Sequence, residues 1–406
     1  MWRKSANGQS RARAEKLLAA AGVHMGDQRP WDIQVHQPAM FSRVLAQGSR
    51  GLGESYMDGW WDCERLDEFF FRILRARLDR MVGSWYDAFH VLSSKLVNLQ
   101  SPSRAFRIGK HHYDIGNGLY QAMLDRRLIY SCGCWDHAVT LDEAQEAKLE
   151  LIGRKLGLQP GMRVLDIGCG WGGTAHYLAD RYRVEVVGVT VSQEQVNFAT
   201  QLCRGLPVEI RYQDYRDLDE RFDRILSVGM LEHVGPKNYG SFMNVVRRCL
   251  DDSGLGLVHC IGIQPTSAGY DPWIARYIFP NSQLPSARQL CQAVEGRFVV
   301  EDWQNLGANY DRTLMHWFNN FQRAWPFLKD RYDERFYRMW RYYLLSCAGA
   351  FRARMNQVWQ IVLSPHGVPG GYRPVRASGL FQESPVDSPA PHRQAVSRQR
   401  VPAVSP

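Results

Sequence analysis

The sequence predicts an α/β fold, an open parallel sheet with helices on both faces, next to a smaller N-terminal helical domain. Short apolar runs of strand length recur between residues 163 and 263, and stretches of helical periodicity separate them. Such alternation is typical of a parallel sheet. The residues before about 105 show helical periodicity, and the chain returns to aromatic-rich helix over residues 310–355.

The strand and helix signals are specific enough to give residue ranges. The stretch "LDEFFFRILRARLDRMV" places apolar residues at helical spacing, with arginines on the other face. The stretch "TLDEAQEAKLELIGRKLG" begins with a capping box, Thr140 to Glu143, and should end at Gly157. The strands are expected at residues 163–168, 184–191, 208–214, 223–230 and 255–263, with a closing strand at 358–364.

Composition limits the class of protein. With 406 residues, 45% of them hydrophobic, the chain can form a main domain and a smaller one. Nine cysteines at irregular spacing do not suggest a disulfide framework, so a reducing compartment is expected. The N-terminal stretch resembles an amphipathic helix more than a secretory signal, and glycines and a proline interrupt the longest uncharged run, near residues 253–270. We therefore expect a cytoplasmic protein.

The net charge of +9 is concentrated at the two ends of the chain. Residues 1–110 carry 17 Lys and Arg against 11 Asp and Glu, and residues 366–406 carry five Arg against two acids. Such ends could meet an anionic membrane surface or a nucleic acid, or could only keep the protein soluble. The Pro-, Ser- and Arg-rich tail has no periodicity. We predict a helical domain at residues 1–105, a catalytic domain at 106–365 and a disordered tail at 366–406.

A glycine-rich loop, "VLDIGCGWGG", lies between a predicted strand and a predicted helix. Gly168, Gly170 and Gly173 match a pattern that suits dinucleotides and S-adenosylmethionine alike, and a purely structural turn is a third interpretation. A nicotinamide site needs an acid at the end of the second strand, but that strand ends "VGVTVSQEQ". Asp166, just before the first glycine, and Asp214, after the third strand, could instead hold amino groups of S-adenosylmethionine.

Polar side chains follow the fourth strand and lie in the fifth. Glu232 and His233 occur in "SVGMLEHVGPKNY", and His259 occurs in "LVHCIGI". A single such residue is more often a hydrogen-bonded core residue. Because active sites of open α/β sheets lie at the carboxyl ends of strands, these side chains together indicate a site.

From about residue 30 to 365 the chain resembles the cyclopropane-fatty-acyl-phospholipid synthases, in their long bacterial form with an N-terminal helical domain. The resemblance rests on "GLGESYMDGWW", "GKHHYDIGN", "YSCGCW", "VLDIGCGWGG", "VGMLEHVGPKNY", "DPWIARYIFPN", "GANYDRTL" and "CAGAFRAR". It implies a Rossmann-like S-adenosylmethionine-dependent methyltransferase fold. It also implies transfer of the methyl(ene) carbon to a cis double bond of an unsaturated phospholipid acyl chain, where a carbocation loses a proton to bound bicarbonate and closes to a cyclopropane.

The resemblance also implies roles for individual residues. The catalytic residues, which would cradle bicarbonate, are Cys132, Glu232, His259, Ile261 and Tyr310, with Cys132 and Ile261 acting through backbone groups. The cofactor-binding residues that it implies are Tyr130, Ser131, Gly168, Gly170, Gln195 and Asp214. Asp166 joins this set because of its place just before the first glycine.

The motif "YSCGCW" has other interpretations. A Cys-x-Cys pair near His111, His112 and His137 is not a usual zinc spacing, so no metal is expected. A disulfide between Cys132 and Cys134 would be strained. The family usually has an aromatic residue where this chain has Cys134, which makes the local packing uncertain but not the chemistry.

The sequence leaves three alternative functions open. An olefin or small-molecule C-methyltransferase would not close a ring, a lipid-binding module would have lost catalysis, and a nicotinamide oxidoreductase would need the missing acid. The expected partner is an unsaturated phospholipid in the bilayer, met by peripheral contact at the inner face of the cytoplasmic membrane. No nucleic-acid partner is expected, and a homodimer is a further expectation.

Overall fold

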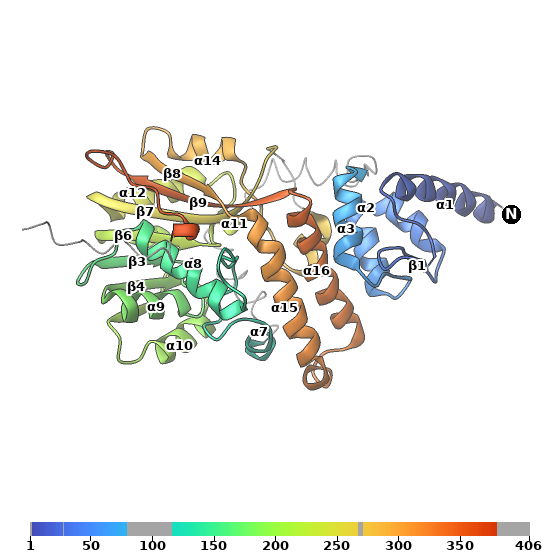
Figure 1. Ribbon diagram of the computed structural model, residues 1–406, viewed down its shortest axis with the longest axis horizontal. Helices are drawn as coiled ribbons and strands as arrows, with labels where there is room; N and C mark the ends of the chain where they lie inside the picture. Colours follow the sequence, from blue (N-terminus) through green and yellow to red (C-terminus); the bar gives the residue numbers. More distant parts are fainter. Residues whose placement is uncertain (1, 27, 79–115, 267–270, 380–406) are drawn as a thin grey trace, which may run out of the picture.

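The computed structural model describes residues 2–26, 28–78, 116–266 and 271–379, with side chains from residue 11 onward. Figure 1 shows a sheet with helices on both faces at one end of the molecule and a smaller group of helices at the other. Helices α15 (Gly307–Leu328) and α16 (Glu334–Arg352) lie between them. The predicted α/β fold with a smaller N-terminal helical part is confirmed.

The main sheet has seven strands in the order β5-β4-β3-β6-β7-β9-β8. Neighbouring strands from β5 to β7 pair in parallel, whereas β9 pairs antiparallel with both β7 and β8. The strands are β3 (Arg163–Ile167), β4 (Glu185–Thr190), β5 (Val208–Tyr212), β6 (Phe222–Val228), β7 (Leu250–Ile263), β8 (Val299–Asn305) and β9 (Asn356–Ser364).

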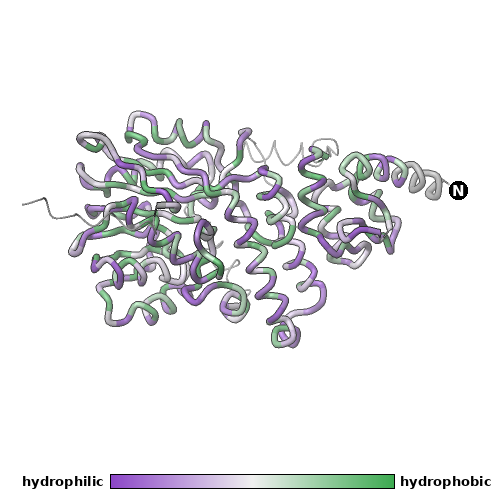
Figure 2. The backbone as a smooth tube through the Cα atoms, viewed as in Figure 1, coloured by the Kyte–Doolittle hydropathy of each residue, from purple (hydrophilic) through white to green (hydrophobic). Residues whose placement is uncertain are grey.

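Alternate residues of the central strands face two different apolar clusters. In β3, Leu165 and Ile167 join one cluster and Val164 joins the other, as the two-residue period of a strand requires. Helices α8 (Leu141–Lys155) and α9 (Gly173–Tyr182) cover the Val164 face, while α11 (Leu231–Val234), α12 (Tyr239–Cys249) and α14 (Ala287–Val294) cover the other. Helices in Figure 2 alternate between hydrophilic and hydrophobic colours along their length, as helices with one buried face should.

The remaining elements are short or belong to the N-terminal part. They are α1 (Trp2–Ala20), β1 (Gln34–Val35), α2 (Ala39–Met57), β2 (Trp61–Asp62), α3 (Leu66–Arg75), α7 (Asn117–Met123), α10 (Gln193–Leu202), η1 (Tyr215–Asp217), α13 (Pro272–Tyr277) and η2 (Ala377–Gly379). The helix expected at "LDEFFFRILRARLDRMV" begins at Leu66 as α3 but ends at Arg75, and α8 begins at the predicted capping box.

Helix α16 joins the N-terminal helices to the catalytic part. The Arg352 guanidinium donates to Asp67 of α3 at 2.8 Å and to Asp311 of α15 at 2.9 Å. At Gly349, α16 comes so close to α3 that an added Cβ would lie 2.6 Å from the carbonyl oxygen of Asp67. The N-terminal part is therefore packed directly against the catalytic part.

Two expectations need correction. The edge strand β8 was not predicted, because its sequence "VVEDWQN" lacks a continuous apolar run. The tail was predicted to begin at residue 366, but residues 366–379 lie against the catalytic part, where Arg376 pairs with the buried Asp302 at 2.7 Å and Ala377 is buried. The rest of the tail, the helical region predicted at residues 79–105, and His111 and His112 lie outside the described residues.

Replacing Gly349 by alanine should separate α16 from α3 and destabilise the protein. The new methyl group would overlap backbone atoms of Asp67 and Phe71, so we expect a loss of about 2–3 kcal/mol in the free energy of unfolding. Gly240→Ala in α12 is the matched control, because the nearest atom to its added Cβ is 3.8 Å away; it should stabilise the protein by up to about 1 kcal/mol. Urea unfolding of both variants measures the difference, and equal stabilities would contradict the close packing.

Candidate active site

A cavity of about 280 Å³ lies at the carboxyl ends of β3, β4, β6 and β7. This is where ligands bind in open α/β sheets. The predicted residues that line it are Tyr130, Ser131, Cys132, Asp166, Gly168, Gly170, Gln195, Glu232, His259, Ile261 and Tyr310. The fold thus brings eleven of the twelve predicted site residues together.

The glycine loop forms one wall of the cavity. It connects β3 to α9, and Gly168 and Gly170 have φ angles of 83° and 56°, which favour glycine over other residues. The loop leads into the N-terminus of α9, where unpaired backbone N–H groups carry partial positive charge. This wall is therefore suited to a polar or anionic group of a ligand.

Near the glycine loop, two buried polar atoms of the cavity lining have no hydrogen-bond partner among the described residues. They are Oδ2 of Asp166 and Nε2 of Gln195. The other end of the Gln195 amide is held, because its Oε1 accepts from Thr190 Oγ1 at 2.7 Å. Burial raises the pKa of Asp166 to about 7, while Lys148 opposes that rise. Unpaired buried polar atoms are costly, so these two atoms indicate a ligand that pairs with them.

Glu232 and His259 form a second polar group in the cavity. One carboxyl oxygen of Glu232 accepts from the backbone N–H of Ile261 at 2.6 Å, and the other has no partner among the described residues. Burial raises the pKa of Glu232 to about 7, with the Ile261 N–H opposing that rise. Glu232 can therefore hold a proton near neutral pH and donate it in a hydrogen bond.

His259 is buried on β7 and is neutral. Burial lowers its pKa well below the ordinary value, and the nearby charges of Lys148 and Lys155 lower it further. The side-chain N–H of Gln360 donates to Nδ1 of His259 at 3.2 Å. The neutral ring then carries its proton on Nε2 and can donate a hydrogen bond from that atom.

Aromatic rings line and support the side of the cavity nearest α15 and α16. The Tyr130 hydroxyl lies 2.7 Å from that of Tyr343, and the Tyr130 ring lies 5.1 Å from the Trp317 ring. Tyr310 packs against Phe351 with ring centroids 4.6 Å apart. Electron-rich ring faces in a site closed to water can stabilise a positive charge.

The "YSCGCW" loop is held from two sides by neutral hydrogen bonds. Thr313 Oγ1 of α15 accepts from the Gly133 N–H at 3.1 Å and from the Trp135 ring N–H at 2.9 Å. The Cys134 N–H donates to the carbonyl oxygen of Ala144 in α8 at 2.8 Å. Burial raises the pKa of the Cys132 thiol well above its ordinary value, which makes it a poor nucleophile.

Cys132 and Cys134 are not joined in a disulfide. All nine cysteines of the chain are free thiols. Within the described ranges, no group of three or more His, Cys, Asp or Glu side chains is arranged to hold a metal ion. Cys134 is fully buried in the large apolar cluster that includes α15 and α16, so it fills the place of an apolar residue.

The sequence analysis did not identify Lys148, which contacts a residue of the cavity wall. Its Nζ donates to Ser131 Oγ at 2.8 Å, and its side chain is completely buried. Burial lowers its pKa to about 8, whereas the charges of Asp125 and Asp166 raise it. A signal was present, because Lys148 lies four residues from the buried Ala144 and Ile152, on the apolar face of the predicted helix.

Asp214 lies outside the cavity where it was predicted to act. Asp214 does not line the cavity, because its carboxylate binds the Arg216 guanidinium at 2.8 and 2.5 Å; its neighbours Gln213 and Tyr215 line the cavity instead. The backbone N–H of Ile261 donates to Glu232, and the contact of an Ile261 backbone group with an anion stays a prediction. Local sequence could not show either pairing.

The chain matches known proteins over most of its length. A family model described as "Mycolic acid cyclopropane synthetase" matches residues 100–361. The cyclopropane-fatty-acyl-phospholipid synthase of Escherichia coli strain K12 is 55% identical over 364 residues, which cover 89% of this chain and 95% of that protein.

Solved structures give the same result. The cyclopropane synthase MmaA2 from Mycobacterium tuberculosis is 31% identical, with a TM-score of 0.61 over 64% of this chain and 97% of its own. The mycolic acid cyclopropane synthase CmaA1, solved in complex with SAH and CTAB, is 32% identical, with a TM-score of 0.60 over 64% of this chain and 97% of its own.

The raised pKa of Glu232 should make stability depend on pH. The folded pKa of about 7 exceeds the ordinary value of 4.5, so the stabilisation from the protonated carboxyl is present below pH 4.5 and is lost as pH rises through about 7. Glu232→Gln removes this loss. As the pH is raised from about 4.5 to 8, the free energy of unfolding of the variant relative to wild type should rise by about 3 kcal/mol.

Urea unfolding at the two pH values measures this gain. The exposed Glu64→Gln variant is the control, and its stability relative to wild type should change by less than about 0.5 kcal/mol. A Glu232→Gln difference that does not vary with pH would show that the Glu232 carboxyl is ionised throughout this range.

Proposed function

Because the chain belongs to the mycolic acid cyclopropane synthetase family, we propose that it is an S-adenosylmethionine-dependent cyclopropane-fatty-acyl-phospholipid synthase. It transfers the methyl(ene) carbon of the cofactor to the cis double bond of an unsaturated phospholipid acyl chain and forms a cyclopropane. One observation carries the proposal most directly: the neutral Glu232 and His259 share an aromatic-walled cavity with the glycine loop.

The residues of the cavity suit the proposed cofactor. The unpaired Asp166 Oδ2 and Gln195 Nε2 offer an acceptor and a donor, and the glycine loop admits a ligand close to its backbone. Tyr130 and Ser131 line the same cavity, and Lys148 holds Ser131 in place. When bound, S-adenosylmethionine supplies an activated methyl group on a sulfonium.

The protein's main contribution is to position the alkene and to keep the site dry. An alkene is a weak nucleophile, so it must be held in line with the methyl donor; such positioning can supply about 7–11 kcal/mol of the barrier. Methyl transfer leaves a cation on the lipid chain, and water would capture that cation. Tyr310, which is 7% exposed, and the neighbouring rings exclude water and face the cation with π electrons.

Ring closure requires a base next to the new methyl group. His259 carries its proton on Nε2 and the Cys132 thiol is protonated, so neither of them is set to accept the proton. Glu232, whose pKa burial raises to about 7, is partly protonated at neutral pH and in that form can donate to an anion. A small anion suits this place, since protonated Glu232 and the Nε2–H of His259 can each donate to it. Bicarbonate held by Glu232, His259 and Tyr310 would supply the base.

We propose peripheral contact with an anionic membrane through the N-terminal helix. Among the described helices, none is long and apolar enough to cross a membrane. Helix α1 exposes Arg13 and Lys16 on its outer side, and the chain's first 110 residues carry an excess of six positive charges. Basic residues near a surface are attracted to anionic lipids.

Product analysis tests the proposed reaction. The purified chain is incubated with S-adenosylmethionine and vesicles of dioleoyl phosphatidylglycerol, and the acyl chains are analysed by mass spectrometry and proton NMR. We expect chains heavier by one methylene group that show cyclopropane protons and no alkene. A methyl-branched product would instead favour an olefin methyltransferase without ring closure, and an unmodified lipid would refute the lipid substrate.

Cys132→Ser should keep most of the activity. The buried thiol is protonated, and its Sγ lies 3.3 and 3.9 Å from the carbonyl oxygens of Gly133 and Leu306. We expect kcat/KM within about fivefold of wild type, because the loop's backbone contacts survive. Cys291→Ser, at an exposed position, is the control. Near-complete loss of activity in a folded Cys132→Ser protein would contradict the assignment and indicate a chemical role for the thiol.

A further inference from the structure

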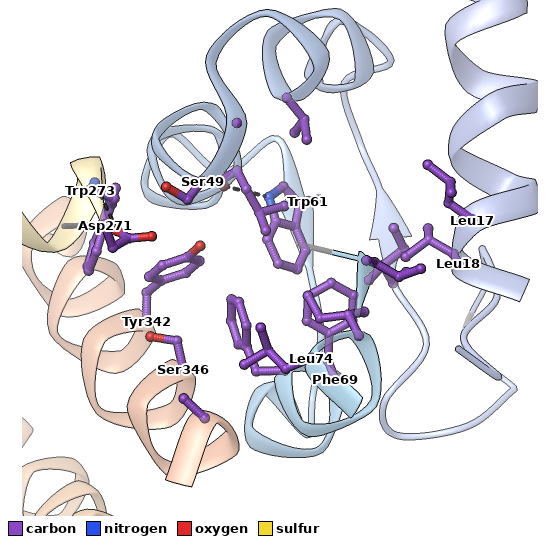
Figure 3. A pocket seen from close by; sticks show the side chains of 18 of the residues that line it. Leu17, Leu18, Ser49, Trp61, Phe69, Leu74, Asp271, Trp273, Tyr342 and Ser346 are labelled. Atoms are coloured by element: carbon purple, nitrogen blue, oxygen red, sulfur yellow. Dashed lines mark hydrogen bonds between the residues drawn. The ribbon is translucent and has the colours of Figure 1, made fainter. Parts of the chain in front are cut away.

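A second and larger cavity, of about 660 Å³, lies in the N-terminal part of the molecule. It is formed by α1, α2 and α3 on one side and by α13 and α16 on the other, and its walls are mostly apolar (Figure 3). The walls include Leu18, Trp61, Phe69, Leu74 and Trp273. Leaving apolar side chains in contact with water lowers the free energy of unfolding of the protein. A cavity of this size with mostly apolar walls therefore indicates an apolar ligand.

The two cavities lie on different sides of helix α16. Tyr342, Ser346 and Ala350 follow one another at four-residue spacing and line the large cavity. Tyr343, on the next face of the helix, contacts Tyr130 and Phe279 of the cofactor cavity. A molecule with two long apolar arms could therefore place one arm on each side of this helix.

The large cavity also contains an unpaired polar group. Helix α2 is interrupted at Gly48, where φ is 57° and ψ is −135°, and the hydroxyl of the next residue, Ser49, is buried without a hydrogen-bond partner among the described residues. Figure 3 places Ser49 on the side of the cavity nearest Tyr342 and Ser346 of α16, and Leu17 and Leu18 on the opposite side. Hydroxyls thus border the side of the cavity formed by α16, and the side formed by α1 is apolar.

The cofactor cavity is too small for the whole substrate. Its volume of about 280 Å³ lies at the lower limit for one drug-sized ligand, and it must hold the cofactor and the reacting alkene. A phospholipid brings a second acyl chain, which needs an apolar environment of its own once the lipid leaves the bilayer.

We propose that the large N-terminal cavity binds the second, unreacted acyl chain of the phospholipid substrate, with its ester end toward Ser49 and its methyl end toward α1. This inference rests on the proposed function, because it takes a two-chain lipid as the substrate. It makes the N-terminal helices part of the substrate site, and it predicts that the enzyme distinguishes lipids with two chains from lipids with one.

Photolabelling tests where the second chain lies without relying on catalysis. The full chain is mixed with vesicles of a phosphatidylglycerol that carries one oleoyl chain and one saturated chain ending in a diazirine. After irradiation, the adducts are located by peptide mass spectrometry. We expect adducts within residues 14–78 that line the cavity, and adducts confined to the lining of the cofactor cavity would overturn the proposal.

A cavity-filling variant gives the matched comparison. Ala350→Phe fills the cavity from α16 and should reduce these adducts about tenfold, whereas Ala46→Phe, at an exposed position of α2, should leave them within about twofold of wild type. Val44→Phe fills the cavity from the opposite wall and replaces Ala350→Phe if that variant does not fold. Unchanged adducts in a folded cavity-filling variant would overturn the proposal.

Activity separates this inference from the proposed function. Ala350→Phe should convert dioleoyl phosphatidylglycerol about tenfold more slowly than wild type, yet convert oleoyl lysophosphatidylglycerol, which has one chain, within about twofold of the wild-type rate. An equal loss on both lipids would refute the second-chain assignment. If wild type converts neither lipid, the proposed function fails, and the photolabelling result alone decides what the cavity binds.

Discussion

The packing of helix α16 against its neighbours on every side is the constraint on which the rest of the structure depends. Its close approach to α3 at Gly349 and the bonds of Arg352 to α3 and α15 fix the N-terminal helices against the catalytic part. The same helix supplies walls to both cavities. A change in its position would therefore alter the domain contact, the apolar cavity and the aromatic wall of the active site together.

Desolvation determines the electrostatics of the active site. Asp166, Glu232 and His259 are each at most 5% exposed, and burial is the largest cause of the pKa shift of each group. Both carboxyl pKa values rise and the histidine pKa falls, so Glu232 and His259 can be neutral hydrogen-bond donors at neutral pH. Such a site can hold a small anion and still tolerate a short-lived cation nearby, because its polar side chains are buried and can be neutral.

Several elements were predictable because their signals are local. The capping box at Thr140 marks the start of α8, and a short apolar run marks β3, which is buried on both faces. The edge strand β8 was missed because it is partly exposed, so its sequence mixes charged and apolar residues. The tail boundary at residue 366 was placed too early, since the bond between Arg376 and Asp302 joins residues 74 positions apart.

The sequence by itself determined the class of fold, the family and the grouping of the site residues, because motifs at the carboxyl ends of parallel strands must meet at one edge of the sheet. Only the tertiary structure decided which polar atoms are free and which are already paired. It showed that Asp214 binds Arg216, that the Ile261 N–H serves Glu232, and that Lys148 reaches Ser131. The large cavity likewise has no sequence motif, since its walls come from helices at both ends of the chain and each wall residue resembles an ordinary core residue.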